Sequence, residues 1–101
     1  AVLDGIDGLF CPTDLLAIGA LDALRIRFGI AVPGRVQVLG FDDIEQAGWA
    51  SYDLSTIRQD VEVQSETVIR LLTERIADPC RPARIEHTPL SVVRRGTTRH
   101  E

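Results

Sequence analysis

The sequence predicts an α/β fold built from parallel βαβ units, and three observations lead to this prediction. Short apolar runs alternate with longer segments whose apolar residues recur at three- and four-residue spacing, as they do in helices. Glycine and proline residues separate these segments and indicate turns between them. The chain of 101 residues is 45% hydrophobic and 26% charged, which is typical of a folded globular protein. Strands that alternate with helices in this way favour a parallel sheet covered by helices on its faces.

The first half of the chain contains a predicted strand, a long helix and a second strand. Residues 6–11 form the first strand, and the helix begins at Thr13 or Asp14. Either side chain can cap the helix, because its oxygen accepts the free backbone N–H groups of the first turn. Gly29 is expected to end the helix, since glycine tolerates the left-handed conformation that is common just past a helix. Residues 36–39 are predicted to form the second strand.

The second half begins with a short predicted helix over residues 44–49 and a strand over residues 54–58. Asp60 is expected to cap a second long helix. Asp78-Pro79 is expected to stop it, because proline disfavours helical geometry in the residue before it. The apolar face of this helix comprises Val61, Val68, Leu71, Leu72 and Ile76, and further extended segments are expected at residues 85–88 and 90–94.

The composition argues against several classes of function. The formal net charge is -4, and no basic stripe of the kind that neutralises DNA phosphates is visible, so any DNA binding must belong to another segment. The spacing of Cys11 and Cys80 matches no zinc motif, and we expect neither a metal site, a cofactor nor a disulfide. No apolar run reaches the ~20 residues needed to cross a bilayer, and no signal peptide precedes the first strand. We therefore expect no membrane association.

Three polar residues follow strands and are candidates for a common ligand site. In open α/β sheets, ligands bind beyond the carboxyl ends of the strands. Thr13, Asp42 and Gln59 each lie close behind a predicted strand, so we expect them to converge on one crevice. A carboxylate such as that of Asp42 can accept two hydrogen bonds from adjacent hydroxyl groups, and such charge-assisted bonds are strong. This chemistry suits a ligand rich in hydroxyl groups.

Helix capping is the alternative role for the aspartates. For Asp14, Asp43 and Asp60 we favour capping, which alone contributes about 1 kcal/mol. For Asp42 the local sequence favours neither capping nor ligand binding, and for Gln59 the default is an exposed or structural role.

Four segments resemble one family of proteins. The helix start P-T-D-L-L-A-I-G-A-L-D-A-L, the segment V-P-G-R-V-Q-V-L-G-F-D-D-I, the strand L-S-T-I-R-Q-D and the closing V-V-R-R-G-T-T occur in order and with family-like spacing. They are similar to motifs of the LacI/GalR transcription regulators and their periplasmic sugar-binding relatives. G-F-D-D alone would be a weak signal, whereas four segments in register over essentially the whole chain are a strong one.

The resemblance implies a periplasmic-binding-protein-like, two-lobed fold that is present here only in part. Residues 1–101 would be the C-terminal portion of the ligand-binding module. Within it, residues 1–59 would lie mostly in one lobe, 60–88 would add a helix and a strand to the other, and 89–101 would form a return strand and tail. The family binds a sugar or nucleoside-like effector between its lobes, with contacts from positions equivalent to Asp42 and Thr13, and with the position of Gln59 at the edge of the cleft.

One residue of the proposed site departs from the family pattern. Thr13 stands where the family usually has asparagine, and it offers one hydroxyl in place of an acceptor and a two-proton donor. This change argues against a standard hexose or pentose as the ligand.

The resemblance also implies a cytoplasmic homodimer that contacts DNA only through a helix-turn-helix domain absent from this chain. Ile18, Trp49 and Tyr52 are the candidates for the dimer interface, although Trp49 could instead pack under its own short helix.

Two other classes of function are alternatives to a regulator. An extracytoplasmic sugar-binding protein of a transporter would have the same fold, but V-P-G-R and L-S-T-I-R-Q look more like regulators. An enzyme is disfavoured, because the sequence has no G-x-S-x-G elbow, no phosphate-cradling glycine loop and no metal-ligand spacing. His87 lies away from the proposed crevice. We therefore expect a binding protein and not an enzyme.

Overall fold

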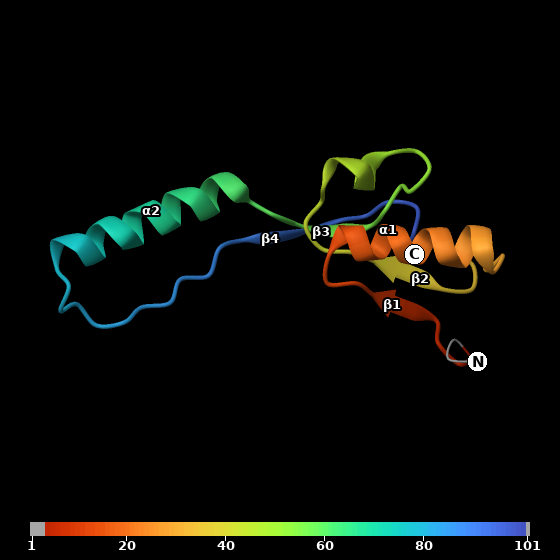
Figure 1. Cartoon of the computed structure of the whole chain (residues 1–101), viewed down its shortest axis with the longest axis horizontal. Coiled ribbons are helices and arrows are strands. Elements are labelled where there is room, and N and C mark those ends of the chain that lie inside the picture. Colours follow the sequence, from red (N-terminus) through yellow and green to blue (C-terminus); the bar gives the residue numbers. More distant parts are fainter. Residues whose placement is uncertain (1–3, 101) are drawn as a thin grey trace. The chain divides into compact units, whose positions relative to one another are not determined.

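The computed structural model describes residues 4–100, which fold as two compact units (Figure 1). The first unit comprises the described residues up to Arg58 together with those from Val92 onward, and the second comprises Gln59–Ser91. The lobe boundaries predicted from the sequence, after residues 59 and 88, concern a larger module and stay a prediction. No helix within residues 4–100 is long and apolar enough to cross a membrane.

The first unit is built around a parallel pair of short strands. β1 (Gly8–Phe10) pairs with β2 (Gln37–Leu39) in parallel, with Leu9 opposite Val38. The backbone continues this parallel arrangement into the next segment through single bridges, Leu39 to Ser55 and Asp42 to Arg58. The elements of this unit are β1 (Gly8–Phe10), α1 (Asp14–Asp22), the π-helical turn η1 (Ala23–Arg27), β2 (Gln37–Leu39) and the 3-10 helix η2 (Glu45–Gly48).

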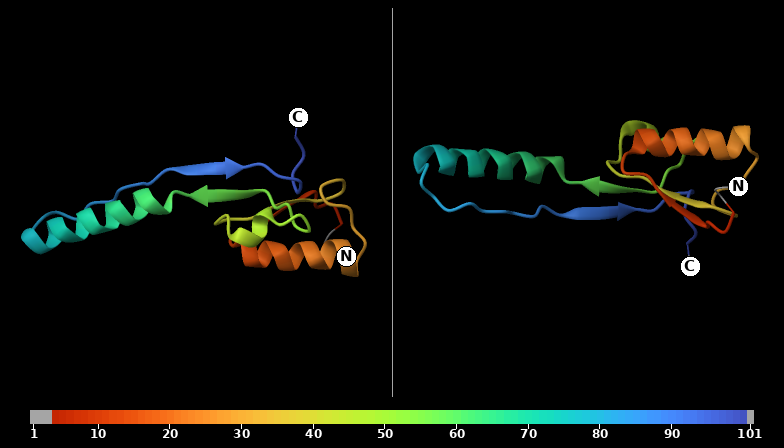
Figure 2. Two further views of the ribbon diagram at one scale, coloured as in Figure 1. Left: turned by 90° about the horizontal axis from the view of Figure 1, so that it is seen from above. Right: turned by 60° about the horizontal axis from the view of Figure 1, so that its bottom comes forward.

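β3 (Thr56–Gln59) and β4 (Leu90–Val93) form a second two-stranded sheet. The two arrows point in opposite directions in both views of Figure 2, so β4 returns antiparallel to β3. The parallel arrangement expected from the sequence therefore holds for β1 and β2 but not for this pair. Each of the two strands begins in one unit and ends in the other.

The core of the first unit lies between α1 and the strands. Apolar residues on one face of α1 and η1 recur at helical spacing and meet the inward-facing residues of β2 and of the segment before β3. Cys11 is buried among them, and Cys80 is exposed. Burial raises the pKa of the Cys11 thiol. The buried apolar residues are Cys11, Ala17, Leu21, Leu24, Val36, Val38, Ala47 and Leu54.

The ends of α1 follow from specific residues. Thr13 is the capping residue, because its Oγ1 accepts a hydrogen bond from the backbone N–H of Leu16 at 3.2 Å. The capping role favoured for Asp14 is wrong, since Asp14 lies inside the helix and its side chain is fully buried. Gly29 has a φ of +63° just past the helical segment, which confirms its predicted role at the helix end.

The second unit consists of the helix α2 (Val61–Ala77) and the segment that follows it. The predicted cap is confirmed, because the Oδ1 atom of Asp60 accepts from the N–H of Val63 at 3.1 Å. No residue of α2 is buried. The exposed large apolar side chains of the helix are Val61, Val63, Val68, Ile69, Leu72 and Ile76.

The extended segment expected at residues 85–88 does not form a strand. Ile85, its one large apolar residue, is 84% exposed and therefore has no core to pack against within the described residues. Glu86 instead pairs with Arg70 of α2 and with the nearby Arg84. Side-chain contacts with the helix, and not a backbone ladder, hold this segment.

Candidate functional site

The segment after β2 has an unusual backbone. Asp42 has a φ of 124° and Asp43 a φ of 59°, so two consecutive non-glycine residues have positive φ angles. The backbone N–H of Asp42 donates to the carbonyl oxygen of Ile57 at 2.9 Å, which ties this turn to β3. The Asp42 residue is exposed. Strained backbone of this kind costs about 1–3 kcal/mol per residue and is concentrated at functional sites.

Asp43 does not cap the short helix η2, contrary to the sequence-based interpretation. The residue that precedes η2 is Ile44, and no side chain caps the helix. The Asp43 carboxylate instead accepts from Arg58, with Nε and Nη2 at 2.8 and 2.7 Å from Oδ2. Nη1 of Arg95 lies 2.8 Å from the other oxygen, Oδ1. The Asp43 carboxylate therefore binds the two arginines and does not cap the backbone N–H groups of η2.

The pKa of Asp43 reflects these neighbours. Burial raises the pKa of the carboxyl group, since the side chain is only 8% exposed. Hydrogen bonds and charge interactions with Arg58 and Arg95 act in the opposite direction and outweigh burial. The pKa of Asp43 therefore lies below its ordinary value of 3.8, and the carboxylate is ionised at neutral pH.

Asp14 joins three segments of the first unit. Its carboxylate accepts from the hydroxyl of Thr56 at 2.6 Å and from the backbone N–H of Ile44 at 2.9 Å. Its own N–H donates to the carbonyl oxygen of Phe41 at 3.0 Å. A Cβ atom on Gly40 would lie 2.2 Å from Asp14 Oδ1, so only glycine fits there. The position of Asp14 beside a capping threonine is the one local feature related to this role, because its partners Ile44 and Thr56 lie 30 and 42 residues away.

These contacts bring two of the predicted site residues into neighbouring segments. Thr13 precedes Asp14 in the chain, and Asp14 bonds to the segment that carries Asp42. Thr13 is exposed, so its hydroxyl caps α1 at a surface position. The first turn of α1 and the turn at Asp42 thus lie together at the carboxyl ends of β1 and β2.

Gln59 is the last residue of β3 and belongs to the second unit. Its Oε1 atom accepts from Nε2 of Gln64 at 2.7 Å, and the residue is half-buried. Its expected convergence with Thr13 and Asp42 stays a prediction.

The three candidates for a dimer interface differ in exposure. Trp49 is 51% exposed, which does not fit the alternative in which it packs beneath its own short helix. Tyr52 is half-buried against the core, and its hydroxyl donates to Oδ2 of Asp22 at 3.4 Å. Ile18 is half-buried on α1. Their role between subunits stays a prediction.

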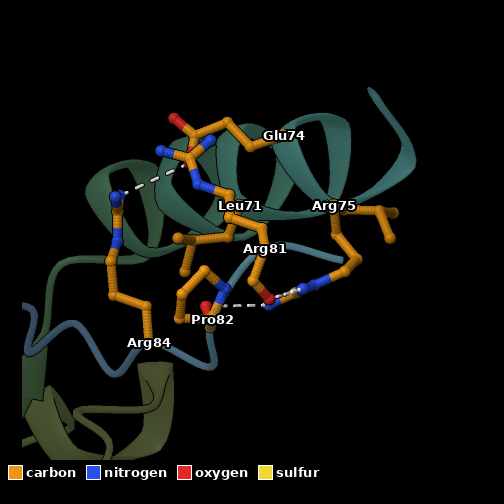
Figure 3. A pocket seen from close by; sticks show the side chains of 7 residues that line it. Leu71, Glu74, Arg75, Arg81, Pro82 and Arg84 are labelled. Atoms are coloured by element: carbon orange, nitrogen blue, oxygen red, sulfur yellow. Dashed lines mark hydrogen bonds and ion pairs between the residues drawn. The ribbon is translucent and has the colours of Figure 1, made fainter. Parts of the chain in front are cut away.

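A pocket of about 260 Å³ lies in the second unit, between the end of α2 and the segment after it (Figure 3). Arg81 and Arg84 both approach Oε2 of Glu74 at 3.4 Å. Arg75 donates to the backbone carbonyl oxygens of Pro79 and Pro82 at 3.3 and 3.2 Å. Because the charged groups of this pocket already bind one another, we do not assign a ligand to it.

No cluster of three or more histidine, cysteine, aspartate or glutamate side chains within the described residues could hold a metal ion. His87 is exposed.

Comparison with known proteins places this arrangement in context. The family model of the periplasmic binding protein-like domain matches residues 3–98. The chain is 40% identical over 73 residues to an uncharacterized HTH-type transcriptional regulator in the aml 5' region of Streptomyces limosus, which covers 72% of this chain and 20% of that protein. It is 33% identical over 89 residues to the HTH-type transcriptional repressor PurR of Aliivibrio fischeri, which covers 88% of this chain and 26% of that protein.

A solved structure agrees with these sequence matches. A LacI family transcriptional regulator from Enterococcus faecalis V583 with bound ribose superposes with a TM-score of 0.75 at 28% identity. The match covers 90% of this chain and 34% of that chain. The chain thus spans about a quarter of the length of the curated relatives that it matches.

Proposed function

Because the chain belongs to the periplasmic-binding-protein-like family of LacI-type transcription regulators, we propose that it is the effector-sensing part of such a regulator. The relatives named above are transcription regulators, so the extracytoplasmic sugar-binding protein of a transporter is not favoured. We propose that the protein is cytoplasmic, because a transcription regulator acts on DNA and the DNA of a bacterium lies in the cytoplasm.

The geometry of the Asp42 turn is the observation that carries this proposal. An exposed carboxylate stands at the carboxyl end of β2 on a backbone with positive φ angles, where open α/β sheets bind their ligands. Such a carboxylate can accept hydrogen bonds from two adjacent hydroxyl groups. We propose a sugar or nucleoside-like effector. The ribose bound to the Enterococcus faecalis relative supports this class.

Thr13 and Gln59 are proposed as secondary contacts. Thr13 is exposed at the start of α1 and would offer its hydroxyl beside Asp42. Gln59 would contribute at the edge of the site once effector is bound. Because threonine is shorter than asparagine and has a single hydroxyl, we expect Thr13 to contribute less to affinity than Asp42 does.

Effector binding is proposed to act on DNA through a separate helix-turn-helix domain, since this chain has a formal net charge of -4. The effector would bind one arrangement of the module more tightly than another and shift the population toward it. The size of that shift is limited by the difference between the two affinities.

A thermal-shift screen of the full-length protein against sugars and nucleosides tests the proposed function. A ligand present at ~100 times its dissociation constant stabilises the native state by ~2.7 kcal/mol, which raises the melting temperature. Asp42→Ala should abolish the shift, whereas Glu45→Ala, which removes another exposed carboxylate nearby, should retain it. A shift that survives Asp42→Ala would keep the binding module but remove Asp42 from the site.

We further propose that the full-length protein is a homodimer with Trp49 in the interface, together with Ile18 and Tyr52. A large aromatic side chain that is 51% exposed is a typical hot-spot residue. Trp49→Ala should weaken the dimer in sedimentation experiments, and Trp49→Phe should largely preserve it. An unchanged dimer of the alanine variant at low concentration would exclude this role.

A further inference from the structure

The turn that carries Asp42 is bound to β3 by both backbone and side-chain contacts. The backbone N–H of Asp42 donates to Ile57, and Asp42 and Arg58 form a parallel bridge. The carboxylate of the next residue, Asp43, accepts hydrogen bonds from the guanidinium group of the same Arg58. The second of the two residues with positive φ angles is therefore itself an ionic anchor of the turn.

The anchor has a second arm. Asp43 uses Oδ2 for Arg58 and Oδ1 for Arg95, so each carboxylate oxygen binds a different arginine. Arg95 is itself fixed, because its Nη1 donates to the carbonyl oxygen of Leu54 at 2.9 Å and its N–H donates to Oγ of Ser55 at 2.8 Å. We call Asp43, Arg58 and Arg95 the Asp43 ion triad.

Burial makes these contacts effective. The side chain of Asp43 is 8% exposed and that of Arg95 is 20% exposed, while Arg58 is 55% exposed. Charge-assisted hydrogen bonds are strongest where water is excluded, so the Arg95 arm should hold Asp43 more firmly than the Arg58 arm does. A carboxylate fixed at both oxygens leaves its own backbone little freedom to rotate.

We propose that Asp43 is a positioning residue for effector binding: through Arg58 and Arg95 it holds the Asp42 turn in its left-handed backbone and so presents the Asp42 carboxylate. This inference rests on the proposed function, in which Asp42 binds the effector. The restraint on the backbone of the turn rests on the ion triad alone. Positive φ angles are costly for residues other than glycine, and they persist only where the surroundings fix them. The triad supplies that constraint from outside the turn.

Asp43→Asn in the full-length protein is the decisive variant. Asparagine has nearly the same shape and tolerates positive φ angles, so the substitution removes the ion pairs without forcing a new backbone. Glu45→Gln is the matched control, because it removes an exposed carboxylate two residues away. Both variants are compared with the unmodified protein.

The first measurement is hydrogen exchange of the peptide that covers residues 40–44, without any ligand. We expect exchange of the Asp42 amide to be at least about tenfold faster in Asp43→Asn, because the ion triad no longer restrains the backbone of the turn. Exchange in Glu45→Gln should be unchanged. Unchanged exchange in Asp43→Asn would overturn the inference, whatever the effector is.

The second measurement is the dissociation constant for D-ribose by calorimetry at a temperature where all variants are folded, set beside their melting temperatures. A positioning role predicts at least about tenfold weaker binding by Asp43→Asn, a loss that corresponds to one step of 1.4 kcal/mol in binding free energy. A lower melting temperature with unchanged affinity would mean that Asp43 only stabilises the fold, and would overturn the inference. If the unmodified protein does not bind D-ribose, ribose is excluded as the effector of the proposed site, and hydrogen exchange still decides the role of Asp43.

Discussion

Two carboxylates, Asp14 and Asp43, bind the turn that carries Asp42 through different partners. Asp14 accepts from neutral groups, a hydroxyl and a backbone N–H, whereas Asp43 accepts from two guanidinium groups. The loss of either carboxylate leaves donors without their acceptor.

Asp43→Asn should lower the free energy of unfolding of the full-length protein by about 2 kcal/mol at pH 7, since it breaks hydrogen bonds between charged groups. The pKa of Asp43 is lower in the folded protein than in the unfolded chain. Its contribution is therefore fully present above about pH 4 and is lost as pH falls through the lower, folded value. Denaturant unfolding at a series of pH values should show the difference between the two proteins shrinking below pH ~4. A difference that stays constant on acidification would contradict the ionic role.

Asp14→Ala should destabilise the protein by about 3 kcal/mol, because the hydroxyl of Thr56 and the N–H of Ile44 lose their acceptor in a buried place. Asp22→Ala on the same helix should lower the unfolding free energy by less than about 1 kcal/mol, since Asp22 is exposed and accepts a single long hydrogen bond, from the Tyr52 hydroxyl at 3.4 Å. Equal effects of the two substitutions in denaturant unfolding would show that Asp14 is not a structural centre.

Single residues were the hardest part to predict from the sequence. The capping rule assigned the same role to Asp14, Asp43 and Asp60, but only Asp60 caps a helix. The partners of the other two, Thr56, Arg58 and Arg95, are distant in the sequence and meet them only in the folded chain. Local pattern cannot report contacts of that kind.

At the scale of elements, periodicity was a better guide. The helix over Val61–Ala77 has the bounds that its cap and its Asp-Pro stop predict. The extended segment expected at residues 85–88 failed, because a strand needs a partner and the described residues offer it none. Helices are specified by neighbours in the chain, whereas strands depend on pairing at a distance.

Glycines in different elements should respond oppositely to a methyl group. Gly40→Ala should be destabilising, since the new Cβ atom would lie 2.2 Å from Asp14 Oδ1 and 3.0 Å from Leu54 Cδ2. Gly19→Ala in α1 meets nothing within 4 Å and should stabilise the helix by roughly 0.5–1 kcal/mol. Thermal unfolding of both variants tests the pair, and a stabilised Gly40→Ala protein would show that the contact with Asp14 is not tight.

At the scale of the whole molecule, the apolar side chains of α2 stand out. Val68, Ile69, Leu72 and Ile76 are each more than half exposed, and none has a core to join within the described residues. Contiguous apolar surface of this kind promotes association. The 101-residue chain by itself should therefore self-associate in sedimentation velocity experiments.

Val68→Ser combined with Ile76→Ser should reduce that association, whereas Thr67→Ser combined with Thr73→Ser on the same helix should not. If the chain is monomeric without substitution, the exposed face of α2 does not drive association.

The buried Thr97 has a consequence for how the protein is made. Its hydroxyl donates to the carbonyl oxygen of Val38 at 2.7 Å and accepts from the N–H of Ser55 at 2.8 Å, while its own carbonyl accepts from the N–H of Val38 at 2.9 Å. Val38 and Ser55 thus lack this partner until the ribosome adds Thr97, which follows them by 59 and 42 residues. Folding during translation can begin at α1 and β2 but cannot finish until the Thr97 codon has been read. A message truncated before that codon should yield a chain that proteases clear quickly.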